Sequence, residues 1–434
     1  MNYQETINYL FNSAPLFQNI GKNAYKAGLD NTYKLDEHFD YPHKKFKTIH
    51  VAGTNGKGSC SHTLAAILQS AGYKTGLYTS PHLIDFRERI KVDGQPVPES
   101  FVVNFIAQHK DFFEPLHPSF FELTTAMAFH YFETQKVDVA VIEVGLGGRM
   151  DCTNIIQPDL SVITNISFDH VQFLGDTLAK IAGEKAGIIK PGVPAVIGET
   201  THETKTVFQH KAEEVGAPIL FAEEEQLLRS YTRNADGSYL YDTQYYPNLT
   251  GELSGLCQEK NTRTILTAIE VLKKEGYQLT ETSVRNGFSN VCQLTGLMGR
   301  WQKLKESPLI ICDTGHNTGG IHYIAQQLKN APYKTLRIVC GMVNDKDING
   351  VLDMLPKDAV YYFTQASVKR ALEANEVMIL GEKHQLHGKA FATVKMATEQ
   401  ALKEANSEDM IFVGGSSFIV ADLLTAIQNG ALHL

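Results

Sequence analysis

The sequence predicts an α/β protein with two domains, the first built on a mostly parallel sheet and the second a smaller Rossmann-like α/β unit. Three observations support this prediction. A glycine-rich turn joins an apolar strand to a helix at 53–59, strand-like and helical runs alternate along the chain, and the alternation restarts after residue 296. The 434 residues exceed the usual size of one hydrophobic core. We therefore predict a first domain at 1–295 and a second at 296–434.

Composition excludes several classes of protein. The net charge of −8 and the pI near 6.1 argue against a nucleic-acid-binding surface. The six cysteines are scattered without C-x-x-C spacing, which indicates reduced thiols and neither disulfides nor a zinc site. The N-terminus has no signal-peptide pattern, and no apolar run approaches the ~20 residues of a membrane span. We expect a cytoplasmic monomer with neither nucleic-acid nor membrane partners.

The glycine-rich turn has the features of a phosphate-binding loop. It follows a strand pattern at 46–51 and precedes helical spacing at 62–70, and such a turn forms a nest of N–H groups for polyphosphate. Lys57 supplies a positive charge and Ser59 a hydroxyl for Mg²⁺. Gly58 separates these two residues, so the match to G-x-x-x-x-G-K-[ST] is imperfect and a turn that binds nothing is the alternative. The loop predicts a P-loop mononucleotide-binding domain whose phosphate contacts are Thr54, Asn55, Gly56, Lys57, Gly58 and Ser59.

The remaining elements follow from periodicity and from proline and glycine positions. In the first domain we predict a helix at 3–11, a polar loop to 45, a strand at 74–79, a loop and hairpin at 83–93, helices near 99–110 and 119–133, strands at 137–144 and 159–166, a helix at 176–189, antiparallel hairpins at 223–256 and an amphipathic helix at 258–275. In the second domain we predict strands at 308–313, 335–340, 359–364 and 410–413.

Polar clusters follow three strands of the second domain, at 313–317, 341–347 and 414–417. The carboxyl ends of parallel strands form the ligand-binding edge of such a sheet. One cluster alone is explained by an ordinary loop, but three indicate a binding edge that faces the first domain.

Strand ends of the first domain carry candidate metal ligands. Glu143 ends the strand 137–144, Ser80 ends the strand 74–79, and His170 follows the strand 159–166. The alternatives are a solvated acid at a strand end for Glu143 and a structural histidine for His170. Lys185 lies on an otherwise small and apolar helix face, where burial penalises its charge. A surface lysine that snorkels to solvent is the reading that the sequence alone favours.

Several segments together resemble the folylpolyglutamate synthase/dihydrofolate synthase family of Mur ligase-like ATP-dependent amide ligases. They are HVAGTNGKGS (50–59), GLYTSPHL (76–83), FFELTTAMAF (120–129), VIEVGLGGRMDCTN (141–154), TNISFDH (164–170), GEKAGIIKPG (183–192), GRW (299–301), DTGHN (313–317) and GMVNDKD (341–347). The resemblance spans nearly the whole chain. It implies an ATP-binding central domain followed by a glutamate ligase domain.

The resemblance also implies a reaction. Family members join the carboxylate of a pteroate or folate to the amine of L-glutamate through an acyl phosphate made from ATP. The implied cofactors are ATP and Mg²⁺ at two sites, with a monovalent cation such as K⁺ as an additional candidate. The Arg149 form of the glycine-rich loop is reminiscent of bacterial bifunctional members.

Residue roles implied by the resemblance are these. Ser59 and Glu143 hold the first Mg²⁺, and Ser80, Glu143 and His170 hold the second. A carbamylated lysine matches Lys185. The implied nucleotide contacts across the domain cleft are Gln258, Asn261, Arg300, Asp313 and His316, and the implied substrate contacts are Phe121, Arg149, Asp151 and Ser416. Lys57, His170, Lys185, Arg300 and His316 are the implied catalytic set. Where the family often has a histidine before Gln258, this chain has Cys257, so no role is assigned to that side chain.

Two alternative functions remain open from the sequence. A Mur-type ligase of peptidoglycan precursors is expected to carry an N-terminal domain for the UDP group, whereas only about 45 residues precede the phosphate loop. A P-loop regulatory ATPase would hydrolyse ATP without a folate acceptor. The polar clusters of the second domain argue against this alternative.

Overall fold

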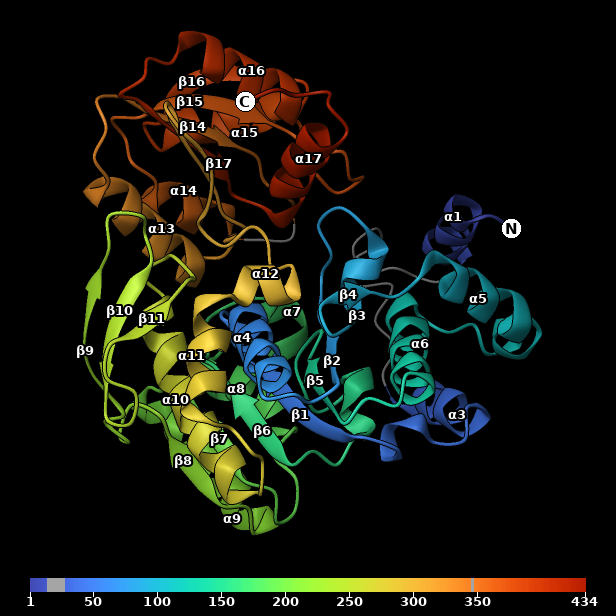
Figure 1. Ribbon diagram of the computed structural model, residues 1–434. Helices are drawn as coiled ribbons and strands as arrows, with labels where there is room; N and C mark the ends of the chain where they lie inside the picture. Colours follow the sequence, from blue (N-terminus) through green and yellow to red (C-terminus); the bar gives the residue numbers. More distant parts are fainter. Residues whose placement is uncertain (14–27, 345–346) are drawn as a thin grey trace. The chain divides into compact units, whose positions relative to one another are not determined.

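The structure, a computed structural model, describes residues 1–13, 28–344 and 347–434 (Figure 1). The described chain divides into two compact units. The first comprises Met1–Ser167, Val171–Glu252 and Gln258–Leu297, and the second comprises Phe168–His170, Leu253–Cys257 and Met298–Leu434. Each unit is described by itself below.

The first unit is built on a mixed sheet of eight strands within the described ranges, in the order β4-β3-β2-β5-β1-β6-β7-β8. Strands β2, β5, β1, β6, β7 and β8 are parallel, and β3 and β4 add an antiparallel edge. The strands are β1 (Lys47–Ala52), β2 (Thr75–Tyr78), β3 (Ile90–Val92), β4 (Gln95–Pro96), β5 (Val139–Glu143), β6 (Leu160–Ile163), β7 (Ala195–Ile197) and β8 (Ile219–Phe221). A separate antiparallel sheet joins β9 (Leu228–Arg233), β10 (Tyr239–Thr243) and β11 (Leu249–Gly251).

Helices cover both faces of the large sheet because its central strands are apolar on both sides. Val139 and Val141 of β5 face one core and Ala140 and Ile142 face the other. The first core includes α4 (Lys57–Ser70), which is buried from Gly58 to Leu68. The α-helices among the described residues of this unit are α1 (Tyr3–Ser13), α3 (Asp30–His38), α4, α5 (Glu99–Phe113), α6 (Phe120–Thr134), α7 (Val171–Leu174), α8 (Leu178–Ala186), α9 (His202–Val215), α10 (Gln258–Lys274), α11 (Glu281–Ser289) and α12 (Val291–Thr295).

The second unit contains, in the part of the chain described, a six-stranded sheet in the order β12-β13-β17-β14-β15-β16. All neighbours are parallel except the antiparallel pair β12–β13. Its elements are β12 (Gln302–Glu306), β13 (Leu309–Cys312), α13 (Thr318–Asn330), β14 (Leu336–Cys340), α14 (Ile348–Met354), β15 (Val360–Thr364), α15 (Ala374–Lys383), β16 (His387–Phe391), α16 (Val394–Glu404), β17 (Met410–Gly414) and α17 (Ser417–Gln428). Parallel strands connected by helices confirm the predicted α/β fold class.

Some predicted boundaries are wrong. Residues 30–38 form the helix α3, not a polar loop, because burial of Leu35 in the core outweighs the weak helical preference of the polar residues around it. Residues 14–27 of the predicted loop lie outside the described residues. The strand predicted at 159–166 ends at Ile163, because the residues that follow it bond to the phosphate loop. In the described ranges, no helix combines the length and apolar character needed to cross a membrane.

Candidate active site

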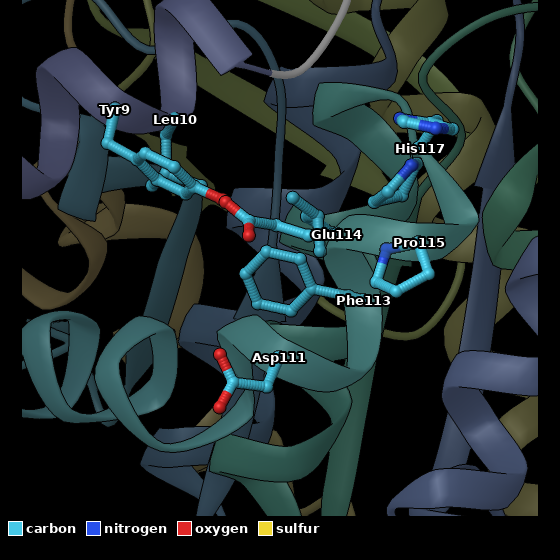
Figure 2. Close-up of a pocket in the computed structure, with 9 residues that line it drawn as sticks. Tyr9, Leu10, Asp111, Phe113, Glu114, Pro115 and His117 are labelled. Carbon is cyan, nitrogen blue, oxygen red and sulfur yellow. The ribbon is translucent and has the colours of Figure 1, made fainter.

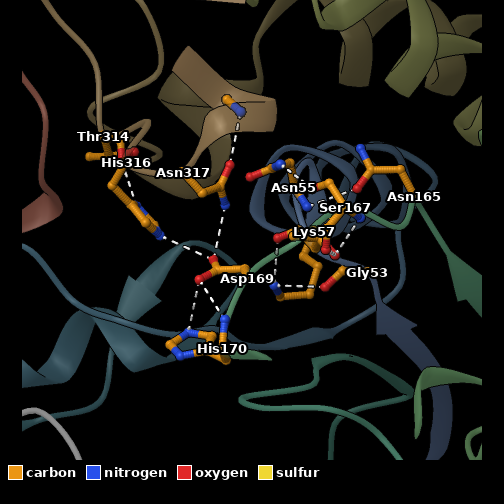
Figure 3. Close-up of polar contacts among 12 residues, drawn as sticks. Gly53, Asn55, Lys57, Asn165, Ser167, Asp169, His170, Thr314, His316 and Asn317 are labelled. Atoms are coloured by element: carbon orange, nitrogen blue, oxygen red, sulfur yellow. Dashed lines mark hydrogen bonds and ion pairs between the residues drawn. The ribbon is translucent and has the colours of Figure 1, made fainter. Parts of the chain in front are cut away.

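The predicted phosphate loop lies between β1 and the N-terminus of α4. Gly56 precedes the helix in the left-handed region, with φ of 83°, and Lys57 is the first helical residue. The Lys57 ammonium donates to the backbone carbonyls of Gly53 at 3.1 Å and Thr54 at 3.2 Å (Figure 3). The loop therefore combines the N-terminal N–H groups of a helix with a positive charge held above them, an arrangement suited to an anion.

A second segment, residues 164–167, holds the loop in shape. The Thr54 N–H donates to the Asn165 carbonyl at 3.0 Å, and the Asn55 N–H donates to Asn165 Oδ1 at 2.9 Å. The Ser167 N–H donates to Thr54 Oγ1 at 3.1 Å, and the Thr164 hydroxyl donates to the Asn55 carbonyl at 2.5 Å. These hydrogen bonds give partners to polar backbone groups of the loop and thereby fix its conformation.

The N-terminal turn of α10 packs on the same loop. Gln258 Nε2 donates to Ser59 Oγ at 3.4 Å, and Asn261 Nδ2 donates to Gln258 Oε1 at 3.0 Å. A Cβ added to Gly56 would lie 2.3 Å from Asn261 Oδ1, so any other residue here requires the Asn261 side chain to shift. Gln258 and Asn261 belong to the first compact unit, next to the loop they were predicted to serve.

Oxygen donors suited to Mg²⁺ lie near the loop. Val51 pairs with Glu143, so the last residue of β5 neighbours the strand that leads into the loop. Ser59 is 2% exposed and Glu143 is 3% exposed. Ser80 follows β2, the neighbour of β5 on its other side. Hydroxyl and carboxylate oxygens fit a hard cation that also keeps water and phosphate ligands. Among the described residues no group of three or more His, Cys, Asp or Glu side chains has the arrangement of a metal site.

Lys185 is buried on α8, with 4% of its surface exposed. The reading as a snorkelling surface lysine is therefore wrong. Thr177 caps this helix by accepting from the Lys180 N–H, and the helix buries Ile181, Ala182 and Ala186 on the same face. A cation at such a position needs compensation or chemical modification.

The three substrate candidates of the first unit lie around the glycine-rich loop after β5. The Phe121 ring packs on Gly145, where an added Cβ would approach it to 2.4 Å. Phe121 is placed by a capping box in which the Ser119 N–H donates to Glu122 at 2.5 Å and the Glu122 N–H donates to Ser119 at 3.2 Å.

Arg149 and Asp151 differ in exposure. Arg149 is exposed and pairs with Glu184 at 2.8 Å. Asp151 is buried, and its carboxylate accepts from the Leu146 N–H at 2.8 Å. Burial raises the pKa of Asp151, although bonds from Thr153 and the loop N–H groups oppose this shift.

His170 lies in the segment Phe168–His170, which packs with the second compact unit and does not directly end a strand. Its neighbour Asp169 accepts from Asn317 Nδ2 at 2.9 Å and lies 3.5 Å from His316 Nε2 (Figure 3). His316 Nδ1 lies 2.9 Å from the Thr314 carbonyl, which can only accept, so this nitrogen carries a proton. The arrangement leaves His316 Nε2 as the nitrogen directed at Asp169.

Asp313 anchors the nucleotide candidates of the second unit. Its carboxylate accepts from the Trp301 N–H and the Gly315 N–H, each at 2.7 Å. Burial raises the pKa of Asp313, while the Arg300 charge opposes that shift. Arg300 donates to the Thr314 hydroxyl. Arg300, Asp313 and His316 therefore belong to one bonded cluster at the end of β13.

The other two predicted polar clusters of this unit, after β17 and after β14, each contain a residue that caps a helix. Ser416 caps α17, where its hydroxyl accepts from the Phe418 N–H at 3.2 Å, and it is buried. A helix N-terminus is a suitable place for a carboxylate. In the predicted cluster 341–347, residues 345 and 346 lie outside the described residues, and Asp347 caps α14.

A cavity of about 490 Å³ lies elsewhere in the first unit (Figure 2). Leu10, Phe113 and Leu123 are among its lining residues, and the Tyr9 hydroxyl donates to Glu114 at 2.8 Å at its rim. None of the described residues that line it belongs to the predicted site.

The sequence prediction did not assign a role to several supporting residues. Thr164, Asn165 and Ser167 lie within the TNISFDH segment, so the motif was recognised while its function, holding the loop, was not. The buried Thr153 and His50, which bond to each other at 2.9 Å, were also missed. They lie in the DCTN and HVAGTNGKGS segments.

Comparison with known proteins identifies the family. The Mur ligase middle domain matches residues 51–239, and the Mur ligase glutamate ligase domain matches residues 299–417. A dihydrofolate synthase/folylpolyglutamate synthase of Escherichia coli is 35% identical over 388 residues, covering 87% of this chain and 86% of that protein.

Solved structures agree. E. coli FolC in complex with DHPP and ADP superposes with a TM-score of 0.85 at 31% identity, covering 99% of both chains. The bifunctional folylpolyglutamate synthase/dihydrofolate synthase of Yersinia pestis, complexed with AMPPNP and Mn ion, gives a TM-score of 0.81 at 29% identity, covering 99% of this chain and 98% of that chain. The chain belongs to the dihydrofolate synthase/folylpolyglutamate synthase family of Mur ligases.

Proposed function

We propose that the protein is an ATP-dependent ligase that joins L-glutamate to dihydropteroate, to reduced folates, or to both, through an acyl phosphate. The observation that carries this proposal is the phosphate loop, in which Lys57 is the first residue of a buried helix. Glu143 lies at the end of β5, the strand that pairs with β1. Sequence identity to the E. coli enzyme along most of the chain supports the choice of substrates.

The proposed reaction places specific demands on the protein. The acceptor carboxylate attacks the γ-phosphate of ATP and releases ADP, and the amine of glutamate then displaces phosphate from the acyl phosphate and loses a proton. Phosphoryl transfer depends on positioning and on neutralisation of charge, and Lys57 and Arg300 would supply positive charge. The helix N-terminus capped by Ser416 would receive a carboxylate of glutamate. Residues 1–295 would thus bind ATP and 296–434 glutamate.

Mg²⁺ would be held at two sites, by Ser59 and Glu143 and by Ser80, Glu143 and His170. When bound, it would neutralise phosphate charge and orient the phosphate oxygens. K⁺ is the candidate for an additional monovalent site. Binding of these ions can be measured by calorimetry on the apoprotein, with Glu143→Gln as the control variant that should weaken Mg²⁺ binding.

Lys185 is proposed to be carbamylated. Its burial supports this, since a carbamate replaces an ammonium with a group that accepts hydrogen bonds and pairs with a cation. Exposure to ¹³C-bicarbonate should give a carbamate signal in ¹³C NMR that is absent from Lys185→Ala. Equal signals from both proteins would reject the modification.

The activity itself is tested by phosphate release. The purified protein should release phosphate from ATP only when L-glutamate and either dihydropteroate or tetrahydrofolate are present. Testing the two acceptors side by side decides whether one or both activities occur. Turnover with UDP-linked peptidoglycan precursors, or ATP hydrolysis without any acceptor, would reject the proposal in favour of a cell-wall ligase or a regulatory ATPase.

The protein is further proposed to act as a cytoplasmic monomer on these small molecules, without nucleic-acid or membrane partners. The net charge of −8 argues against a nucleic-acid partner, and the six free cysteines are typical of a reducing compartment such as the cytoplasm. Light scattering at several protein concentrations tests the monomer, since a mass that rises toward twice 48.2 kDa would contradict it.

A further inference from the structure

Three buried polar side chains are hydrogen-bonded in series next to the glycine-rich loop that follows β5. His50, on β1, is fully buried, and its Nε2 lies 2.9 Å from the Thr153 hydroxyl. Thr153, also fully buried, lies 2.5 Å from Asp151 Oδ1. The three residues come from the central strand and from the turn after the loop, and they all belong to the first compact unit.

The chemistry of these groups sets the direction of the hydrogen bonds. Burial lowers the pKa of His50 to about 3, so its ring is neutral and carries one proton. The single hydroxyl proton of Thr153 is donated to the Asp151 carboxylate, which only accepts. The Thr153 oxygen must therefore accept from His50, and the proton of His50 resides on Nε2. No hydrogen-bond partner for His50 Nδ1 lies among the described residues, which fits a nitrogen without a proton.

Asp151 connects these hydrogen bonds to the backbone of the loop. Its Oδ1 also accepts from the Thr153 N–H at 3.0 Å, and its Oδ2 accepts from the Leu146 N–H at 2.8 Å. The Asp151 N–H donates in turn to the Gly148 carbonyl at 3.1 Å. The carboxylate is thus bonded to both sides of the loop, and its rotamer depends on the Thr153 hydroxyl.

The loop has little freedom to shift without moving its neighbours. A Cβ on Gly145 would meet the Phe121 ring at 2.4 Å, and one on Gly148 would meet the Glu184 carbonyl at 2.7 Å and the Lys185 Cα at 3.0 Å. Backbone of the loop therefore touches both Phe121 and the end of α8. A displacement of a few tenths of an ångström would be transmitted to both.

We propose that His50 and Thr153 are positioning residues for the acceptor, acting through Asp151 to hold residues 145–149 and Phe121 in the conformation that binds the pteroate or folate. This inference rests on the proposed function, in which Phe121, Arg149 and Asp151 contact the acceptor. It differs from a purely structural role because it predicts an effect confined to one of the three substrates.

The first test compares Thr153→Val with Thr153→Ser. Valine matches the shape of threonine but removes the hydroxyl, so the KM for the acceptor should rise about tenfold or more, while the KM values for ATP and glutamate stay within about twofold. Serine keeps the hydroxyl and should restore the acceptor KM to within about threefold of the wild type. Equal changes in all three KM values, or a change only in the melting temperature, would overturn the inference.

The second test changes His50, at the other end of the three hydrogen-bonded side chains, and does not depend on folding of Thr153→Val. His50→Leu removes the donor to Thr153, whereas His50→Gln keeps an N–H near the position of Nε2. The acceptor KM should rise in His50→Leu and largely recover in His50→Gln, and equal acceptor KM values in the two variants would reject the inference. A wild-type protein without folate-dependent turnover would instead reject the proposed function, so the two failures are distinguishable.

Discussion

Replacing Gly56 by alanine tests whether the loop geometry, and not its composition alone, binds ATP. Gly56 has φ of 83° at the start of α4, and an added Cβ would lie 2.3 Å from Asn261 Oδ1. The methyl group therefore meets two penalties. The backbone must hold a conformation that L-residues disfavour, and the Asn261 side chain must move away from its bond to Gln258.

The size of the effect follows from these two terms. A left-handed conformation costs a non-glycine residue roughly 1–2 kcal/mol. Loss of the hydrogen bond from Asn261 to Gln258 costs about 0.5–1.5 kcal/mol. If the loop relaxes by giving up the geometry that binds phosphate, the combined cost of about 1.5–3.5 kcal/mol appears in the affinity for ATP, as a loss of about 10- to 300-fold.

Gly72→Ala supplies a matched control in the same protein. Gly72 has φ of 88° just beyond the other end of α4, and no heavy atom lies within 4 Å of its added Cβ. This variant should lose stability by roughly 1–2 kcal/mol and bind ATP normally. The assay is calorimetric titration with a non-hydrolysable ATP analogue, together with thermal unfolding. ATP affinity of Gly56→Ala within twofold of the wild type would refute the reasoning, as would an equal loss of affinity in Gly72→Ala.

Three further changes test other parts of the molecule. Lys57→Ala should lower kcat by about 10²- to 10³-fold with an unchanged circular dichroism spectrum, because it removes the positive charge that the loop offers to phosphate and leaves the loop backbone in place; near-normal kcat would contradict its role. Lys185→Ala should lose turnover and regain part of it with added short carboxylates, whereas an active, unrescued variant would show that the lysine is structural. In the second unit, burial alone would raise the pKa of Asp409, but bonds from the Asn406 N–H and from Arg337 outweigh it and lower the pKa. The stabilisation is therefore complete above the ordinary aspartate pKa of about 3.9 and is lost as the pH falls through the lower folded value; the free energy of unfolding should fall less steeply on acidification in Asp409→Asn, and equal slopes would reject the assignment.

The fold was largely predictable because its strands are apolar enough to stand out. The apolar run at 137–144 predicts a strand inside a parallel sheet and the run at 410–413 predicts a strand, and the observed strands 139–143 and 410–414 are buried throughout. Two of the elements that were missed have no such pattern. The helix α3 is mostly polar and is stabilised by burial of Leu35, and the edge strand β16 is only partly buried. Tertiary contacts determine such elements, and periodicity in the sequence does not reveal them.

The sequence motifs predict site residues, but they do not predict the contacts that join one motif to another. The spacing of Lys57 and Ser59 is typical of loops that contact phosphate directly, so the residues alone predict this chemistry. The partnership of Gln258 with Ser59 joins residues 199 positions apart, and no local pattern encodes it. The bonds from Thr164 and Asn165 to the loop are likewise set by the pairing of β1 with β6.

Lys185 shows how a residue's type and its spacing can disagree. Ile181, Ala182, Lys185 and Ala186 recur at helical spacing, and all four are buried. The periodicity therefore placed Lys185 on the buried face, while the usual behaviour of lysine favoured the surface. An ammonium in the last turn of α8 is favoured by the helix dipole by about 0.3–1 kcal/mol, and a carbamate there is disfavoured by a similar amount. A nearby cation would offset this penalty, so the ¹³C carbamate signal should strengthen with added Mg²⁺ and weaken with a chelator.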